Sequence, residues 1–139
     1  MRLPSALIAS ATLILASYAH AQCPDSVYVR MLAPPDYPPI AIIAKLQGTV
    51  KVNVEIAKDG KVTSASASGA HQILNDLSKE NAMKWIFSPD SDEPQGCKLT
   101  ITYVYKIEGK PSYHPRPHRV VLKLPTRVEI TAQPGIPNP

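Results

Sequence analysis

The stretch GTVKVNVEIAKDGKVTSASASG, residues 48–69, decides the fold of this chain. Its first half alternates apolar and polar side chains, and the apolar set is Val50, Val52, Val54 and Ile56. This period of two predicts a half-buried antiparallel strand. Asp59–Gly60 then predicts a tight hairpin turn, because glycine adopts the positive φ angles that such a turn needs. A return strand from Lys61 to about Ser68 completes the hairpin.

The return strand is poor in bulky side chains, so a large apolar surface must pack over it. The segment from His71 to Trp85 supplies that surface, because Leu74, Leu77 and Trp85 fall near one stripe of a helix. Residues Lys98 to Ile107 alternate again and predict a third strand. The predicted order is therefore strand, turn, strand, helix, strand.

Residues 1–21 have the features of a signal peptide. Arg2 gives a positive start, the run from Leu3 to Ser17 is apolar and uncharged, and Ala19-His20-Ala21 matches the small-x-small cleavage pattern. We therefore predict cleavage between Ala21 and Gln22. The alternative is an uncleaved membrane anchor, although the apolar run is at or below the roughly 20 residues that span a bilayer. We expect membrane association only in that alternative.

Export changes the meaning of the two cysteines, Cys23 and Cys97. In an oxidising compartment two cysteines usually pair, whereas cytosolic thiols are kept reduced. A Cys23–Cys97 disulfide would tie the start of the exported chain to the third predicted strand. We predict this disulfide, and two unpaired thiols are the alternative.

Proline-rich regions flank the predicted core, and the whole chain has 15 prolines. Residues 22–35 show no sustained period and are predicted to be a lead-in segment. A short helix is expected to begin at Pro39, a residue that suits the first helical position. The extension 109–139 holds two short β-like pieces within Arg119–Thr131, separated by Pro125, and a loose proline-rich tail.

Several classes of chemistry have little support in the sequence. The net charge of +4 is spread without a basic run, so nucleic-acid binding is not expected. His114 and His118 are four residues apart, but the prolines between them forbid the helix that would align two metal ligands. No Gly-x-Ser-x-Gly elbow is present. We therefore expect neither catalytic activity nor a metal or other cofactor.

The order of these signals resembles the C-terminal domain of TonB energy transducers. The matching motifs are Tyr37-Pro38, Gly48, Val50-x-Val52-x-Val54, Asp59-Gly60-x-Val62, Ser68-Gly69, Leu74, Ala82 and Trp85-x-Phe87-x-Pro89. The resemblance covers about residues 36–107 and implies a domain at 36–108. It also implies an α+β fold of two layers, in which one long helix packs on one face of a three-stranded antiparallel sheet. Here the extension would add one or two further strands.

The resemblance also implies a function. Members of this family lie in the periplasm of Gram-negative bacteria and bind a short extended segment, the TonB box, of outer-membrane receptors by strand addition. In this chain the matching sheet edge is Lys98–Ile107, and the Tyr-Pro segment lies where family members also touch the receptor. The residues implied to contact the partner are Asp36, Tyr37, Pro38, Lys98, Leu99, Thr100, Ile101, Thr102, Tyr103, Val104 and Tyr105. The large aromatic residues Tyr37, Trp85 and Phe87 are nevertheless expected to be mainly core residues.

Two functional hypotheses stay open. The first is a periplasmic or secreted TonB-like binding module, or an inner-membrane anchored one if residues 1–21 are retained, linked to energy-dependent transmembrane transport. The second is a stand-alone structural or adaptor domain that self-associates, as a homodimer for example, without energy transduction. The strands in Arg119–Thr131 bear on both hypotheses, because they could occupy the receptor-binding edge or pair two copies.

Overall fold

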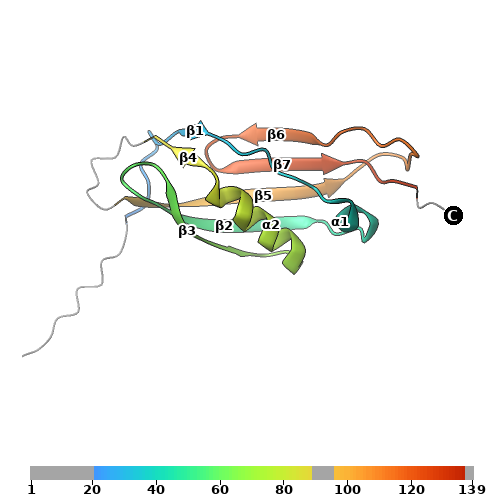
Figure 1. The fold of residues 1–139 in the computed structure, drawn as a ribbon, viewed down its shortest axis with the longest axis horizontal. Helices are drawn as coiled ribbons and strands as arrows, with labels where there is room; N and C mark the ends of the chain where they lie inside the picture. The colour runs from blue at the N-terminus through green and yellow to red at the C-terminus, as the bar shows by residue number, and fades with distance from the viewer. Residues whose placement is uncertain (1–20, 89–95, 137–139) are drawn as a thin grey trace, which may run out of the picture.

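A five-stranded sheet forms one layer of the protein, and a helix covers part of one face (Figure 1). The computed structural model describes residues 21–88 and 96–136. The elements in chain order are β1 (Val29–Met31), α1 (Pro39–Ile43), β2 (Gly48–Ile56), β3 (Val62–Ser68), α2 (Gln72–Met83), β4 (Ile86–Phe87), β5 (Cys97–Ile107), β6 (Arg119–Lys123) and β7 (Arg127–Ala132). Over these ranges no helix is long and apolar enough to cross a membrane. The predicted signal peptide, apart from Ala21, lies outside the described residues.

The predicted hairpin is confirmed. β2 pairs antiparallel with β3, with Val54 opposite Ala65. The turn between them depends on Gly60, which has a φ of 89°. A Cβ at this position would collide with the carbonyl oxygen of Phe87, so only glycine fits. The Asp59 carboxylate supports the turn by accepting a hydrogen bond from the backbone N–H of Lys61 at 3.0 Å.

The long helix is also confirmed, but it ends earlier than predicted. α2 stops at Met83, so Trp85 lies beyond it. The next residues form β4, which pairs antiparallel with β1, with Phe87 opposite Val29. This pairing draws the chain out of the helix, an interaction across the fold that a helical periodicity does not reveal. β1 itself lies in the lead-in segment 22–35, for which the sequence shows no period.

The predicted α+β class holds and the three predicted core strands pair antiparallel, but the C-terminal strands extend them into a mixed five-stranded sheet, and a separate two-stranded sheet is added. The main sheet has the order β3-β2-β5-β7-β6. Both predicted C-terminal strands join it, and β7 runs parallel to β5. The extension is part of the core rather than an appendage, because Val128 and Ile130 are fully buried.

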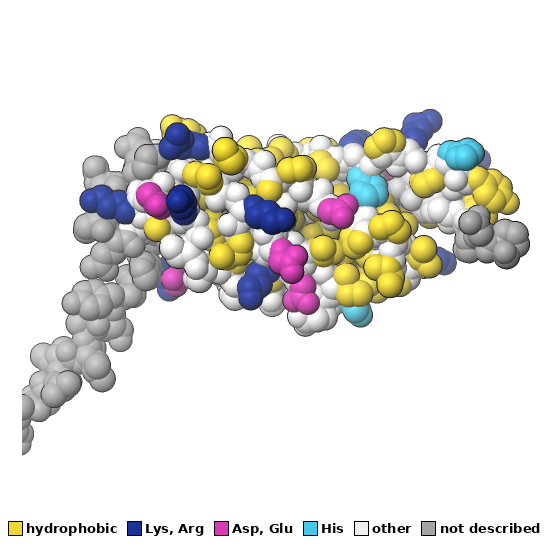
Figure 2. All heavy atoms as spheres, in the orientation of Figure 1, with side chains coloured by type: hydrophobic (Ala, Val, Ile, Leu, Met, Phe, Trp, Pro, Cys, Tyr) yellow, Lys and Arg dark blue, Asp and Glu magenta, His cyan; other side chains and the backbone are white. Residues whose placement is uncertain are grey.

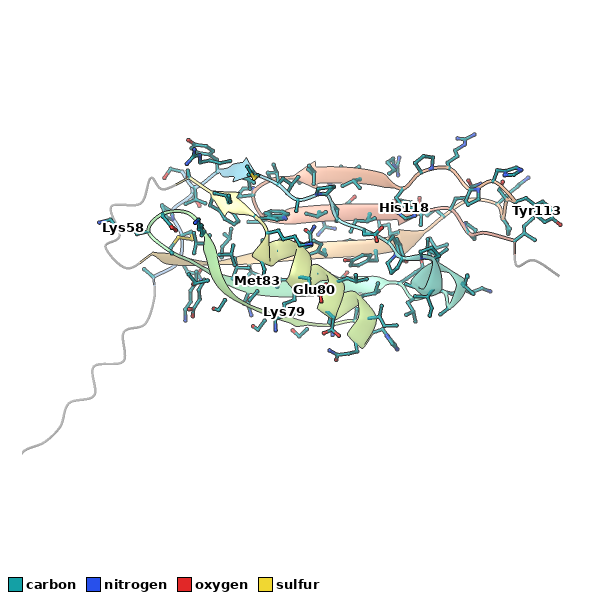
Figure 3. All side chains as sticks on the ribbon, viewed as in Figure 1. Lys58, Lys79, Glu80, Met83, Tyr113 and His118 are labelled. Atoms are coloured by element: carbon teal, nitrogen blue, oxygen red, sulfur yellow. A yellow bond between two sulfur atoms is a disulfide. The ribbon has the colours of Figure 1, made fainter. Side chains whose placement is uncertain are left out.

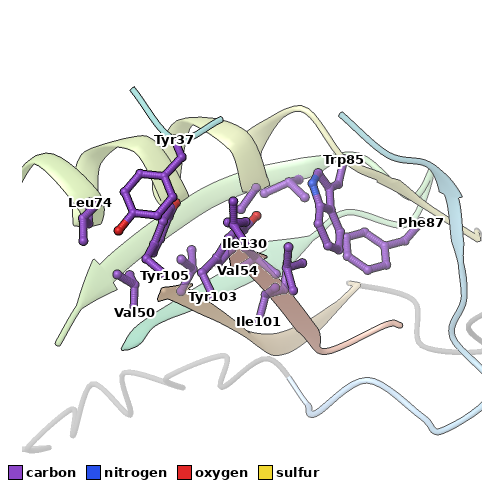
Figure 4. Packing of buried hydrophobic residues seen from close by; sticks show 14 of the residues in the cluster. Tyr37, Val50, Val54, Leu74, Trp85, Phe87, Ile101, Tyr103, Tyr105 and Ile130 are labelled. Atoms are coloured by element: carbon purple, nitrogen blue, oxygen red, sulfur yellow. The ribbon is translucent and has the colours of Figure 1, made fainter. Parts of the chain in front are cut away.

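The core lies between the sheet and two segments that cross the same face. α2 covers the side near β3 and β2, and residues between β1 and α1 cross nearer β7 (Figure 1). Figure 4 shows Leu74, Trp85 and Tyr37 lying over the apolar side chains of the strands. The small side chains of β3 leave room for α2, as the sequence predicts.

Asn81 joins three parts of this core. Its side-chain oxygen accepts hydrogen bonds from the Trp85 indole N–H at 2.9 Å and the Tyr103 hydroxyl at 2.7 Å. Its amide group donates to the backbone carbonyls of Ala33 and Pro34. Asn81 thereby links α2 to β5 and to the crossing segment, the residues between β1 and α1. A nearby hydroxyl pair is similar, since Ser78 and Tyr105 are hydrogen-bonded at 2.8 Å.

The predicted disulfide is present. Cys23 and Cys97 are bonded with a Cα–Cα distance of 4.8 Å and a sequence separation of 74. Cys97 is the buried first residue of β5. The bond therefore ties the start of the described chain to the end of a central strand.

Replacing both Cys23 and Cys97 by alanine should lower the free energy of unfolding by up to about 4.5 kcal/mol, the chain-entropy figure for a loop of this length. Denaturant titration of the oxidised protein and the double variant measures the difference. The reduced wild-type protein serves as the control, and it should match the double variant. Equal stability of all three would contradict the expectation.

Asn81→Ala should lower the free energy of unfolding by about 2–4 kcal/mol, because the buried groups of Trp85 and Tyr103 lose their acceptor. Lys79→Ala, on the exposed side of the same helix, is the control and should change stability by less than about 0.5 kcal/mol. Equilibrium denaturation measures both. A loss at Asn81 no larger than at Lys79 would show that the network adds little.

Candidate partner-binding site

The strand predicted to be the open edge of the sheet lies in its centre. β5 pairs antiparallel with β2 from Cys97 to Tyr105. On its other side, Thr102 to Ile107 pair in parallel with β7. The prediction that Lys98–Ile107 is an open edge of the sheet is therefore wrong for this chain. The reason is the C-terminal hairpin, which occupies that edge.

Residues at the start of the described chain pair with the first part of β5, on the same side of the strand as β7. The Lys98 N–H donates to the Ala21 carbonyl at 2.8 Å, and the Cys23 N–H donates to the Lys98 carbonyl at 2.9 Å. The disulfide holds this short segment in place. In the part of the chain that the structure describes, only residues 99–101 have no strand beside them on this side. Three residues are at the lower limit for a strand partner.

The β6–β7 hairpin that pairs with β5 is packed firmly against it. Tyr103 lies opposite Val128, and Tyr105 lies opposite Ile130, with all four side chains almost fully buried. Burying one valine and one isoleucine stabilises the fold by about 3–6 kcal/mol. That is a large fraction of the roughly 5–15 kcal/mol that stabilises a whole domain. Displacing β7 by an incoming peptide would thus cost much of the stability of the protein.

The Tyr-Pro segment is mainly structural, as expected for its aromatic residue. Tyr37 is fully buried, donates its hydroxyl to the Leu46 carbonyl and packs edge-on against Tyr105 at 5.2 Å (Figure 4). Burial, with a smaller contribution from Tyr105, raises the pKa of Tyr37 to about 12. Burial likewise raises the pKa of Tyr105, partly offset by the hydrogen bond with Ser78. Asp36 alone of the three is exposed, and its carboxylate accepts from the Tyr37 N–H at 2.8 Å.

The other implied contact residues divide by the face of β5 on which they lie. Ile101, Tyr103 and Tyr105 point into the core and cannot present side chains to a partner. On the opposite face Lys98 and Thr100 are exposed. The remaining three, Leu99, Thr102 and Val104, are half-buried or buried. These residues therefore form no continuous binding surface.

The described part of the main sheet has two open edges, β3 and β6. β3 offers chiefly serine and alanine side chains. β6 differs, because all five of its residues are exposed and three of them are apolar, namely Val120, Val121 and Leu122. An exposed apolar edge strand is a ready template for pairing with another strand. The run of valines and leucine was visible in the sequence, but its position at an edge was not.

β6 and the neighbouring strand β7 together carry more positive than negative charge, since Glu129 is their one acidic residue. Glu129 on β7 accepts a hydrogen bond from Arg127 at 2.9 Å and lies 3.5 Å from the Lys123 ammonium group. The bond from Arg127, helped by the charges of Lys123 and Lys106, lowers the pKa of the Glu129 carboxyl group. The Glu129 carboxylate thus forms ion pairs with two cations, Lys123 and Arg127, on this face of the hairpin.

A second surface feature lies at the end of the molecule near α1. A hollow of about 570 Å³ separates α1 from the 112–118 loop, with Ile42, Tyr113 and His118 in its lining. Figure 2 shows hydrophobic side chains gathered over α1, and Figure 3 places Tyr113 and His118 at this end. His118 packs against the Tyr37 ring at 5.9 Å. Over residues 21–88 and 96–136 no three His, Cys, Asp or Glu side chains gather as they would around a metal ion.

One comparison with known proteins identifies a family. The family model described as the Gram-negative bacterial TonB protein C-terminal matches residues 33–107, more than half of the 139-residue chain. The match ends with β5, so β6 and β7 lie beyond it. No curated protein matches the chain.

If the hairpin is an integral part of the core, Ile130→Ala should lower the free energy of unfolding by about 2–4 kcal/mol. Val121→Ala, on the exposed neighbouring strand, is the control and should cost less than about 0.5 kcal/mol. Denaturant titration measures both values. Hydrogen exchange adds a second test, since amides of β7 should exchange as slowly as those of β2. Fast exchange of β7 alone would indicate a detachable strand.

Proposed function

Because the chain belongs to the family of the Gram-negative bacterial TonB protein C-terminal domain, we propose that it is a non-enzymatic binding module of the cell envelope. It binds extended segments of outer-membrane receptors, the TonB box, by strand addition and so takes part in energy-dependent transmembrane transport. Family membership supports the role in transport and a location in the envelope. We propose the identity of the segment and its mode of binding.

The observation that carries this proposal is a sheet with an open apolar edge. β6 presents one row of backbone N–H and C=O groups to solvent, together with the exposed side chains of Val120, Val121 and Leu122. Strand addition uses such an edge, because main-chain hydrogen bonds supply affinity and alternate side chains supply selectivity. The closed side of β5 supports capture at a different strand from the one that the family resemblance implied.

Several polar and thiol side chains of the described residues are held by partners within the fold. Both cysteines are bonded to each other, and Ser78 is held between the Leu74 carbonyl and the Tyr105 hydroxyl. Every buried side-chain nitrogen and oxygen of the described residues has a hydrogen-bond partner. The described interior is used for structure.

A self-associating adaptor is the second candidate, and the exposed apolar residues of β6 are the observation that favours it. Two copies could pair along this strand and bury Val120, Val121 and Leu122 of each. Such a dimer would need neither a receptor nor energy transduction. The two functions differ in what occupies β6, and a single solution experiment can separate them.

The test is a calorimetric titration of the purified protein with TonB-box peptides taken from outer-membrane receptors. The expected result is saturable binding of one peptide per chain. The matched control is the same peptide with alternate backbone amides N-methylated, which removes the hydrogen bonds that a strand needs. Absence of binding, with a dimer in sedimentation, would reject receptor capture in favour of the adaptor.

A further inference from the structure

The free edge of β6 combines an apolar centre with a positive charge at each end. Its sequence from residue 119 to residue 123 is Arg-Val-Val-Leu-Lys, and all five side chains are exposed. We propose that β6 is the docking edge of this protein, and that it takes an extended peptide in which two acidic residues flank three apolar ones. This inference rests on the proposed function and adds the site and the chemical class of the peptide.

The register of the hairpin determines how such a peptide would meet β6. Val120 lies opposite Ile130, and Leu122 lies opposite Val128, so these two β6 side chains are on the core face of the sheet. Arg119, Val121 and Lys123 are therefore on the other face. In a strand pair each side chain lies beside the residue directly opposite it. A complementary peptide therefore has acidic residues at its first and fifth positions, opposite Arg119 and Lys123, and apolar residues between them. The pattern is symmetric, so it suits either strand direction.

The charged side chains at the two ends of β6 are exposed to solvent. The Lys123 ammonium group is 3.5 Å from Glu129, but that carboxylate is closer to Arg127, and the Lys123 side chain is 60% exposed. Among the described residues, no carboxylate lies within ion-pair distance of Arg119. Lys106 lies on the same face, on the strand beyond β7. An acidic peptide would therefore meet Arg119 without a described carboxylate partner at one end, and at the other end Lys123, which shares Glu129 with Arg127.

The same charges argue against a second copy of the chain as the occupant. Antiparallel pairing of two β6 strands centred on Val121 places Arg119 of one copy opposite Lys123 of the other, twice. Parallel pairing in register places arginine against arginine and lysine against lysine. Like charges directly opposite each other destabilise a strand pair, and β6 contains no acidic residue to relieve them. The adaptor dimer is thus disfavoured at this edge.

The other open edge lacks these features. From Thr63 to Ser68, β3 carries only serine, threonine and alanine, with neither a charge nor a large apolar side chain. It can offer backbone hydrogen bonds but no selectivity. The two edges therefore make different predictions for a charged peptide.

The experiment uses the whole exported chain and synthetic peptide probes. The first probe is the acetylated and amidated peptide Ser-Glu-Val-Val-Val-Glu-Ser, and the second has lysine in place of both glutamates. Two exposed ion pairs should make the acidic probe bind about tenfold more tightly than the basic one at low salt. Hydrogen exchange should show slower exchange of β6 amides with the acidic probe. The acidic probe with N-methylated amides should give neither effect.

Two charge variants test the residues themselves. Arg119→Glu with Lys123→Glu should reverse the preference between the probes. Arg119→Gln with Lys123→Gln removes the charges without adding an acid beside Glu129, and it should abolish the preference. The matched control is Lys79→Glu with Lys84→Glu, which makes the same change of net charge at two exposed residues. Lys79 lies on α2 (Figure 3), and Lys84 directly follows that helix. This control variant should keep the wild-type preference.

The possible failures are distinct. Binding of a TonB-box peptide that protects β3 or residues 99–101, and not β6, would overturn this inference and leave the proposed function standing. Equal binding of the acidic and basic probes, or a wild-type preference in both Arg119/Lys123 variants, would overturn the charge rule. A dimer with β6 protected in the absence of peptide would identify a second copy as the occupant. Failure of every probe and every TonB-box peptide to bind would reject the inference and the proposed function together.

Discussion

The parallel pairing of β7 with β5 is the interaction on which the rest of the structure depends. It buries Val128 and Ile130 against Tyr103 and Tyr105 of β5. It thereby completes the core that α2 and the crossing segment cover. It also converts β5 from an edge into a central strand, flanked over most of its length on both sides. The open edge moves two strands outward, to β6. Stability and binding surface are thus set by the same contact.

The segment before α1 has a comparable double role. Its backbone carbonyls at Ala33 and Pro34 are bonded to Asn81, and its Tyr37 packs into the core beside Tyr105. These contacts hold the segment against the sheet. There it covers the part of the sheet face that α2 does not cover. A segment that resemblance assigned to partner contact therefore contributes mainly to packing. The Tyr37 side chain is buried and is not presented to a partner, whereas Asp36 is exposed.

The charged residues at its two ends distinguish the β6 edge from the other open edge of the described sheet. A strand of bare apolar residues at a sheet edge invites indiscriminate pairing, and natural proteins often limit this with charged ends. In β6 the cations Arg119 and Lys123 serve that purpose against a second copy of the chain. The same cations make the edge selective for an acidic segment. Protection from self-association and recognition of a partner then follow from one arrangement of side chains.

The sequence by itself determined the local features of the fold, because these depend on near neighbours along the chain. The alternation from Val50 to Ile56 specified a half-buried strand, Asp59–Gly60 specified its turn, and the apolar stripe after His71 specified the helix. The two cysteines, read with the predicted signal peptide, specified the disulfide. The tertiary structure alone decided that Lys98–Ile107 is central, that β4 ends the helix by pairing with β1, and that β6 is the free edge. A period of two reports which face of a strand is buried, but it does not report which strands lie beside it. That order is fixed by contacts between distant parts of the chain.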